Sequence, residues 1–200
     1  MLFNSLQFLV FFPIVVLAYY VIPARLKNLW LLLASYYFYM CWSARYALLM
    51  LLSTVVTWGF GLLTAKAGRL AMRRGGRGEE RSAKRFLLLK KWCVALSFII
   101  NLSILFFFKY FNFAADTVAS LAGRIGISFE APAFSVLLPV GISFYTFQAL
   151  GYTVDVYRGL EPEKNLLDYA LFVSFFPQLV AGPIERPQNL LPQLKAEHRF

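Results

Sequence analysis

The feature that most constrains this chain is Tyr46–Ala65, a stretch of twenty residues without a single charge. At a rise of about 1.5 Å per residue, twenty helical residues cover the hydrocarbon core of a bilayer, which is ~30 Å thick. Moreover, 60% of all residues are hydrophobic and only 15% are charged, too apolar a composition for a water-soluble or disordered chain. We therefore expect an all-α, polytopic membrane bundle.

Four further apolar stretches extend this pattern, namely Leu6–Ile22, Leu29–Trp42, Trp92–Ala115 and Val136–Tyr157. The first follows no Lys or Arg and precedes no small-residue cleavage site, so we expect a retained helix rather than a signal peptide. The second is short and contains YYFYMCW, an aromatic cluster typical of the membrane interface. Gly59 and Gly61 would permit close helix approach in the twenty-residue stretch. The sequence thus predicts about five transmembrane helices.

A basic segment, 66–91, separates two of these stretches and holds ten Lys and Arg against two acidic residues. A flexible basic arm that binds nucleic acid is one interpretation. A cytoplasmic loop near anionic lipid is the other, and the flanking apolar stretches favour it, so we expect no nucleic-acid partner. With five spans, one side of the membrane carries 14 Lys and Arg and the other carries 2. This asymmetry predicts a cytoplasmic loop 66–91 and an N-terminus outside.

The segment 166–183 differs from a plain span. Asn165 and Asp168 have the spacing of a helix cap, and Pro177 and Gln178 then interrupt about a dozen apolar residues. So short a segment cannot cross the bilayer, and irregular backbone at membrane depth needs protein or a water-filled cavity around it. We predict a broken or re-entrant helix that lines a cavity. A short interfacial helix is the alternative.

Polar side chains follow one face of the stretch Val136–Tyr157. Steps of four, three, four and three residues join Gly141, Tyr145, Gln148, Tyr152 and Asp155. Since lipid disfavours such groups, this polar stripe should face the protein interior or water. It is either a substrate path or a set of interhelical hydrogen bonds, with Asp155 reaching the interface beside Arg158. Both alternatives stay open.

Few other residues suggest chemistry. Lys109 is interpreted as a snorkelling lysine, with a functional intramembrane charge as the alternative, and Asn101 as a helix-packing amide. His198 lies in the charged sequence KAEHRF and is not expected to be catalytic. Cys41 and Cys93 lack metal-ligand spacing and are interpreted as buried small hydrophobes. We expect no metal site and no bound cofactor.

Two segments resemble a known family: LPVGISFYTFQALGYTVDVYRG at 138–159 and NLLDYALFVSFFPQLVAGPIERPQNLLPQL at 165–194. They are similar to membrane-bound O-acyltransferases, in particular to the bacterial branch of alginate O-acetylases and D-alanyl transfer proteins. FNSLQFLVFFPIVVLAYYVIP at 3–23 and LLLASYYFYMCW at 31–42 resemble the N-terminal region of the same branch. The resemblance therefore covers essentially all 200 residues.

The resemblance implies transfer of an acyl group, in the first place acetyl, to hydroxyls of an extracellular polysaccharide such as alginate. The donor would be an acyl-CoA or an acyl-carrier protein, at the bacterial inner membrane beside other polysaccharide-biosynthesis proteins. A catalytic histidine in a Trp-His motif would deprotonate the acceptor hydroxyl. That motif belongs to the later half of the family and has no match here, so we expect the catalytic histidine to lie beyond Phe200. Residues 1–200 thus resemble the N-terminal portion of a single domain, which is expected to be inactive alone.

Within this portion, the resemblance implies that eight residues shape the walls of a substrate tunnel. They are Tyr145, Gln148, Tyr152, Asp155, Pro177, Gln178, Gly182 and Pro183. Two alternatives remain: D-alanyl transfer to teichoic acid within the family, and a non-catalytic membrane scaffold or transporter subunit outside it. Many transporters contain paired inverted repeats with broken helices in both halves, whereas this sequence has one broken segment.

Overall fold

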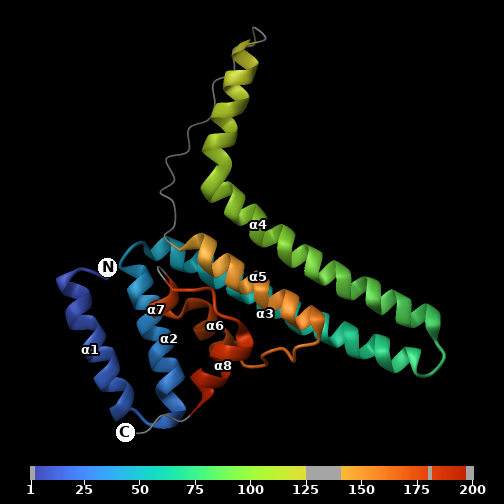
Figure 1. The fold of residues 1–200 in the computed structure, drawn as a ribbon, viewed down its shortest axis with the longest axis horizontal. Coiled ribbons are helices and arrows are strands. Elements are labelled where there is room, and N and C mark those ends of the chain that lie inside the picture. Colours follow the sequence, from blue (N-terminus) through green and yellow to red (C-terminus); the bar gives the residue numbers. More distant parts are fainter. Residues whose placement is uncertain (1–2, 125–140, 180–181, 197–200) are drawn as a thin grey trace.

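The computed structural model describes residues 3–124, 141–179 and 182–196, and the regular secondary structure in these ranges is entirely α-helical (Figure 1). The helices are α1 (Leu6–Val21), α2 (Ala24–Met40), α3 (Ala44–Gly75), α4 (Glu80–Arg124), α5 (Ile142–Arg158), α6 (Leu166–Ser174), α7 (Phe176–Leu179) and α8 (Pro187–Lys195). The expected all-α class is therefore confirmed for the described part of the chain.

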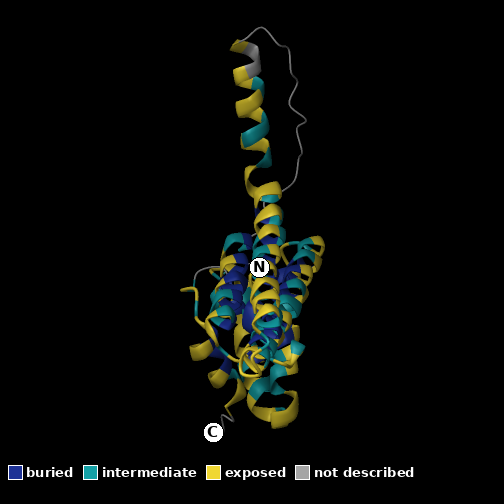
Figure 2. Ribbon diagram, turned by 90° about the vertical axis from the view of Figure 1, so that its right-hand side faces the viewer, coloured by how far each residue is buried: buried dark blue, intermediate teal, exposed yellow. Residues whose placement is uncertain are grey.

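The main hydrophobic core lies where α3, α5 and α6 meet. Met50, Tyr145, Tyr152, Tyr169 and Phe172 are almost completely buried there. Figure 2 shows that the buried residues gather in this body of the molecule. Tyr145, Gln148 and Tyr152 of the predicted polar stripe are therefore buried inside the protein, whereas Gly141 and Asp155 at its two ends are partly exposed.

At the edge of the body, α1 packs against α2 and α7 through aromatic rings. The ring of Phe11 lies 5.5 Å from that of Phe176, and the ring of Phe8 lies 6.0 Å from that of Phe38. Phe38 and its neighbour Tyr39 are both buried. These two residues of the predicted aromatic cluster therefore face the bundle, whereas Tyr37 and Trp42 are exposed, and the position of the cluster at the membrane interface stays a prediction.

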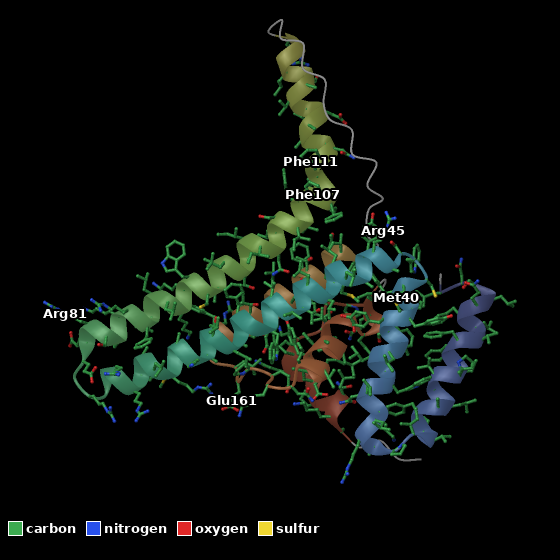
Figure 3. The ribbon with its side chains drawn as sticks, turned by 180° about the vertical axis from the view of Figure 1, so that it is seen from behind. Met40, Arg45, Arg81, Phe107, Phe111 and Glu161 are labelled. Carbon is green, nitrogen blue, oxygen red and sulfur yellow. The ribbon has the colours of Figure 1, made fainter. Side chains whose placement is uncertain are left out.

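The long helices α3 and α4 form an antiparallel hairpin, which corrects the prediction of a basic loop over 66–91. Only residues 76–79 connect the helices, and Arg74 Nη1 lies 2.5 Å from Glu79 Oε2 at this turn. Figure 3 labels Arg81 at the tip of the hairpin. Most Lys and Arg residues of the segment are thus carried on helices rather than on a flexible loop.

Small side chains explain why the helices continue beyond the apolar stretches. Thr64, Ala67 and Ala71 are buried at helical spacing on the face of α3 that packs on its neighbours. Such short side chains let a neighbouring helix approach closely. The basic residues occupy the other faces, so that charge and helix packing do not compete.

The far part of α4 leaves the body of the molecule. Figure 3 labels Phe107 and Phe111 near the point of departure, and Figure 2 shows mostly exposed and intermediate residues beyond it. The side chain of Phe113 in this part is 72% exposed. With 45 residues, α4 is much longer than the predicted stretch Trp92–Ala115.

The segment 166–183 contains the predicted broken helix. The Asn165 side chain caps α6 by accepting from the Leu167 N–H at 3.0 Å, and α6 ends at Ser174, because the ψ of 107° at the C-cap Phe175 is not helical. The Lys195 ammonium at the end of α8 lies 2.5 Å from a Glu163 carboxylate oxygen, just before α6 begins. Helices α6 to α8 thus leave one end of the bundle and return to it.

Helix α7, which follows the break, ends beside the N-terminus of α5. Gly141 precedes α5 with a φ of +74°, and a Cβ atom there would lie 2.6 Å from the Leu179 carbonyl oxygen at the end of α7. Both the positive φ and this close contact favour glycine. Helices α6 and α7 therefore run along the length of α5.

Two described helices, α3 and α4, are long and apolar enough to cross a membrane, while α1 and the segment Leu166–Leu179 are shorter apolar helices. Large apolar side chains such as Leu9, Leu48 and Leu88 are exposed on the surface. So much exposed apolar surface indicates a membrane protein. The count of about five spans stays a prediction.

The two glycines on α3 give a matched test of its packing. A Cβ atom at Gly61 would lie 2.8 Å from Tyr152 Cε1, which confirms the predicted close approach, whereas nothing lies within 4 Å at Gly59, where that prediction is wrong. We expect Gly61→Ala to lower the stability of the protein by about 1–3 kcal/mol through overpacking. Gly59→Ala should keep or raise the stability by up to about 1 kcal/mol.

Thermal unfolding of the two variants in one detergent measures this difference. Equal melting temperatures for the Gly61→Ala and Gly59→Ala variants would contradict the close packing of α3 on α5.

Candidate functional site

The candidate site is built around the break between α6 and α7. A continuous helix would join the Phe176 N–H to the Phe172 carbonyl, and the break separates these two groups. The Gln148 side chain of α5 donates from Nε2 to the Phe172 carbonyl at 2.7 Å. The Phe176 N–H donates to the Ser35 hydroxyl of α2 at 3.3 Å. Side chains from two other helices therefore satisfy both backbone groups.

The next polar residue of the stripe, Tyr152, also bonds the backbone. Its hydroxyl accepts a hydrogen bond from the Glu163 N–H at 3.0 Å, and its ring centroid lies 4.4 Å from that of Tyr169. The Tyr169 hydroxyl in turn donates to Thr57 at 2.9 Å. Gln148 thus forms an interhelical hydrogen bond, one of the two alternatives that the spacing allowed, whereas Tyr152 bonds the connection between α5 and α6.

A cavity of about 280 Å³ opens beside this network. It is lined by Gln148, Gly151, Tyr152, Val154, Asp155 and Arg158 of α5 and by residues 184–187 before and at the start of α8. Asp155 and Glu185 bring carboxylates to this cavity, and Arg158 and Arg186 bring guanidinium groups. A cavity with both charge signs fits a polar ligand rather than an acyl chain.

Four buried side-chain oxygens near the break have no hydrogen-bond partner among the described residues. They are the hydroxyls of Tyr36, Tyr39 and Tyr145 and the Oε1 of Gln178. The rings of Tyr39 and Tyr145 meet edge to face at 6.5 Å. Because a buried polar group without a partner costs about 1–3 kcal/mol, these oxygens are candidates to bind a substrate group.

The remaining predicted tunnel residues do not line the α5 cavity. Pro177 is exposed and lines a different hollow, between α1 and α8. The Gly182 N–H donates to the Gln178 carbonyl at 3.1 Å, and Pro183 is exposed. The structure thus brings Gln148, Tyr152 and Asp155 to one cavity, which the other members of the predicted set do not line.

Asn101 and Lys109, the two other polar residues considered within the apolar stretches, each form hydrogen bonds with other residues of the chain. Asn101 is buried, donates to the Ser97 carbonyl at 2.8 Å and accepts from Ser53, which confirms a packing amide. The Lys109 ammonium donates to the Ser143 hydroxyl at 3.3 Å.

The end of the chain contains the one histidine of the sequence, His198. His198 and Phe200 both lie outside the described residues, which end at 196. The interpretation of His198 as non-catalytic therefore stays a prediction. The same holds for the expectation that the catalytic histidine of the family lies beyond Phe200.

Neither Cys41 nor Cys93 forms a disulfide bond within the described part of the chain. Cys93 is buried as expected, whereas Cys41 is exposed, so that prediction was wrong for Cys41, the C-cap of α2. In the described ranges no three His, Cys, Asp or Glu side chains gather where they could hold a metal ion.

Sequence reasoning missed Tyr36, Tyr39, Ser35 and Glu163. A serine within an apolar helix, with a tyrosine four residues later on the same face, is the signal that marks Ser35 and Tyr39. Glu163 gave no signal, because it takes part through its backbone N–H.

Comparisons with known proteins found similar sequences. The chain is 38% identical over 195 residues to the probable alginate O-acetylase AlgI of Azotobacter vinelandii, covering 96% of this chain and 36% of that protein. It is 40% identical to the protein of that name from Pseudomonas syringae pv. tomato, covering 96% and 34%. The peptidoglycan O-acetyltransferase of Helicobacter pylori is 32% identical over 226 residues, covering 98% and 39%.

The chain therefore spans little more than a third of the length of these curated relatives. No protein-family model matches it, and no solved structure matches it.

The hydrogen bonds at the break predict opposite effects of two substitutions on α5. Gln148→Leu leaves the Phe172 carbonyl buried without its partner, and we expect a loss of about 1–3 kcal/mol of stability. Tyr145→Phe removes a hydroxyl that has no described partner, so stability should stay equal or rise. Thermal unfolding in detergent measures both, and a destabilised Tyr145→Phe variant would show that its hydroxyl is bonded.

Proposed function

This chain is homologous to alginate O-acetylases over 96% of its length, and we propose that it forms part of a membrane-bound O-acetyltransferase that acts on an extracellular polysaccharide. The relatives are named for O-acetyl transfer to two acceptors, alginate and peptidoglycan. What these names share is acetyl transfer to a glycan. They favour acetyl over the D-alanyl group that the sequence left as an alternative.

The observation that carries this proposal is the polar face of α5 beside a broken helix within an apolar bundle. Membrane bundles tolerate such backbone only where protein or a cavity surrounds it. Here the Gln148 amide supports the break, and the cavity with Asp155 lies next to it. We propose that this cavity belongs to the path of the polar acceptor or of the polar part of the donor.

The reaction joins the acceptor hydroxyl oxygen to the acetyl carbon of a thioester donor, an acyl-CoA or an acyl-carrier protein. The carbon–sulfur bond breaks, and the donor leaves as a thiol. A general base takes the hydroxyl proton, and the family resemblance assigns this role to a histidine that none of the described residues supplies. We propose that this chain provides scaffold and substrate path and does not transfer acetyl alone.

We further propose an orientation in the bacterial inner membrane. The basic hairpin of α3 and α4 lies in the cytoplasm, and the N-terminus lies outside. A donor made in the cytoplasm would then enter from the hairpin side. The acceptor glycan and the other proteins of its biosynthesis would approach from the opposite side.

One test of the proposed function measures acetyl transfer by the enzyme that contains this chain. We expect Asp155→Asn and Gln178→Leu each to lower acetyl incorporation into the polysaccharide at least tenfold, because Asp155 lines the α5 cavity and the Oε1 of Gln178 is buried near the break without a described partner. The measurement is the acetyl content of the polymer, made alongside a quantification of the enzyme in the membrane.

Two substitutions of the same chemistry serve as controls. Asp116→Asn and Gln188→Leu change exposed residues that do not line the cavity and should leave acetyl incorporation within twofold. Full activity of both the Asp155 and the Gln178 variants, at normal membrane levels, would refute the proposed path.

A second prediction concerns orientation. After replacement of Cys41 and Cys93 by serine, Arg77→Cys lies in the turn of the basic hairpin and Ser43→Cys lies between α2 and α3. A membrane-impermeant maleimide should label the Ser43→Cys variant in spheroplasts and the Arg77→Cys variant only after the membrane is opened. The reverse pattern would place the basic hairpin outside.

A further inference from the structure

Two adjoining hollows lie between α1, α2 and α8, away from the α5 cavity. The larger has a volume of about 310 Å³ and the smaller about 190 Å³, and both are lined by Tyr19 and Leu194. Neither shares a lining residue with the α5 cavity. Together they form one groove, which we call the α1–α8 groove.

The larger hollow is apolar. Phe12, Val16, Leu31, Phe175 and Leu190 are among its lining residues, and Gln193 is its one polar amide. Phe12 and Tyr20 lie eight residues apart on α1, so the hollow extends over about 12 Å of helix. Both of these rim residues are exposed, and Figure 1 shows α1 at the edge of the bundle. We infer from these two observations that the groove opens sideways.

The smaller hollow is basic. Arg25, Lys27 and Lys195 line it, together with Asn28 at the start of α2. The Lys27 ammonium lies 4.6 Å from the centroid of the Tyr19 ring, which places this cation where the two hollows meet. The groove is therefore apolar along its length and cationic at one end.

Two carboxylates lie near the basic end. Glu163 and Asp168 face Lys195 at 2.5 Å and 3.9 Å, and Asp168 also accepts a hydrogen bond from Asn28 at 2.9 Å. Three cations against two carboxylates leave a net charge of +1. Attraction for an anion therefore comes mainly from Arg25 and Lys27.

We propose that the α1–α8 groove binds an anionic phospholipid, with one acyl chain in the apolar hollow and the phosphate at Arg25 and Lys27. The cationic end lies where the orientation proposed above puts the cytoplasmic headgroups, beside the predicted connection 23–28. A Lys or Arg near an anionic leaflet attracts its lipids, and two such residues at one end of the groove favour an anionic headgroup there. Because the groove opens sideways at the edge of the bundle, a lipid enters it directly from the bilayer.

Native mass spectrometry of the full chain in a mild detergent tests this proposal. Phosphatidylglycerol and phosphatidylcholine with identical acyl chains are titrated separately, and the occupancy of the first bound lipid gives an apparent Kd. We expect phosphatidylglycerol to bind at least fivefold more tightly. The double variant Arg25→Gln/Lys27→Gln should lose this preference.

A matched control removes the same charge elsewhere. Arg69→Gln/Arg73→Gln changes two exposed residues of the basic hairpin and should alter the Kd by less than twofold. Val16→Trp, which fills the apolar hollow, should weaken binding of both lipids without a change of charge. Since the Arg25/Lys27 substitutions affect surface side chains, they test the site even where Val16→Trp impairs folding.

Three outcomes would overturn the proposal. Equal affinity for the two lipids would remove the headgroup site, and an equal loss in the Arg69/Arg73 variant would reduce the effect to overall charge. Displacement of phosphatidylglycerol by acetyl-CoA, one molecule for one, would assign the groove to the acyl donor. None of these measurements uses acetyl transfer, so the lipid site and the proposed enzymatic function can fail separately.

Discussion

The architecture depends on which side chains form hydrogen bonds with the backbone groups that are freed at the break between α6 and α7. An apolar environment offers no water to an exposed carbonyl or amide, so a break survives only with other partners. Gln148 bonds the Phe172 carbonyl and Ser35 accepts from the Phe176 N–H, which ties α5 and α2 to the same break. Pro177 lacks an N–H and so leaves one fewer group to satisfy. These contacts fix the course of α6 and α7 along α5.

The same principle explains which parts of the site the sequence could predict. Polar residues at steps of three and four residues indicate a buried face of one helix, and the stripe on α5 is indeed buried at Tyr145, Gln148 and Tyr152. Local spacing says nothing, however, about the partner of each side chain. The contact from Gln148 to Phe172 joins residues 24 positions apart, and only the fold brings them together. The eight predicted tunnel residues therefore divide among several surroundings.

The basic hairpin shows a different limit of sequence reasoning. Counting charges between Lys66 and Lys91 predicted a loop, because membrane spans exclude charge and loops collect it. Helix formation depends instead on propensity and packing, and neither Lys nor Arg opposes a helix. The informative residues were the uncharged ones: Ala67 and Ala71 are one turn apart and buried. Charged residues thus indicate which parts of a helix are disfavoured in lipid. Buried small residues such as Ala67 and Ala71 indicate which parts of a helix continue to pack against a neighbouring helix.

Helix α8 lines both the α5 cavity and the α1–α8 groove. Pro187 at its start lines the α5 cavity, while Leu190 and Leu194 line the α1–α8 groove. Its last residue, Lys195, is held by Glu163, whose own N–H bonds Tyr152. A lipid in the groove would therefore pack against α8, and both ends of this helix contact residues of the α5 site. An annular lipid at this position would thus support the broken helix from outside, as Gln148 and Ser35 support it from inside.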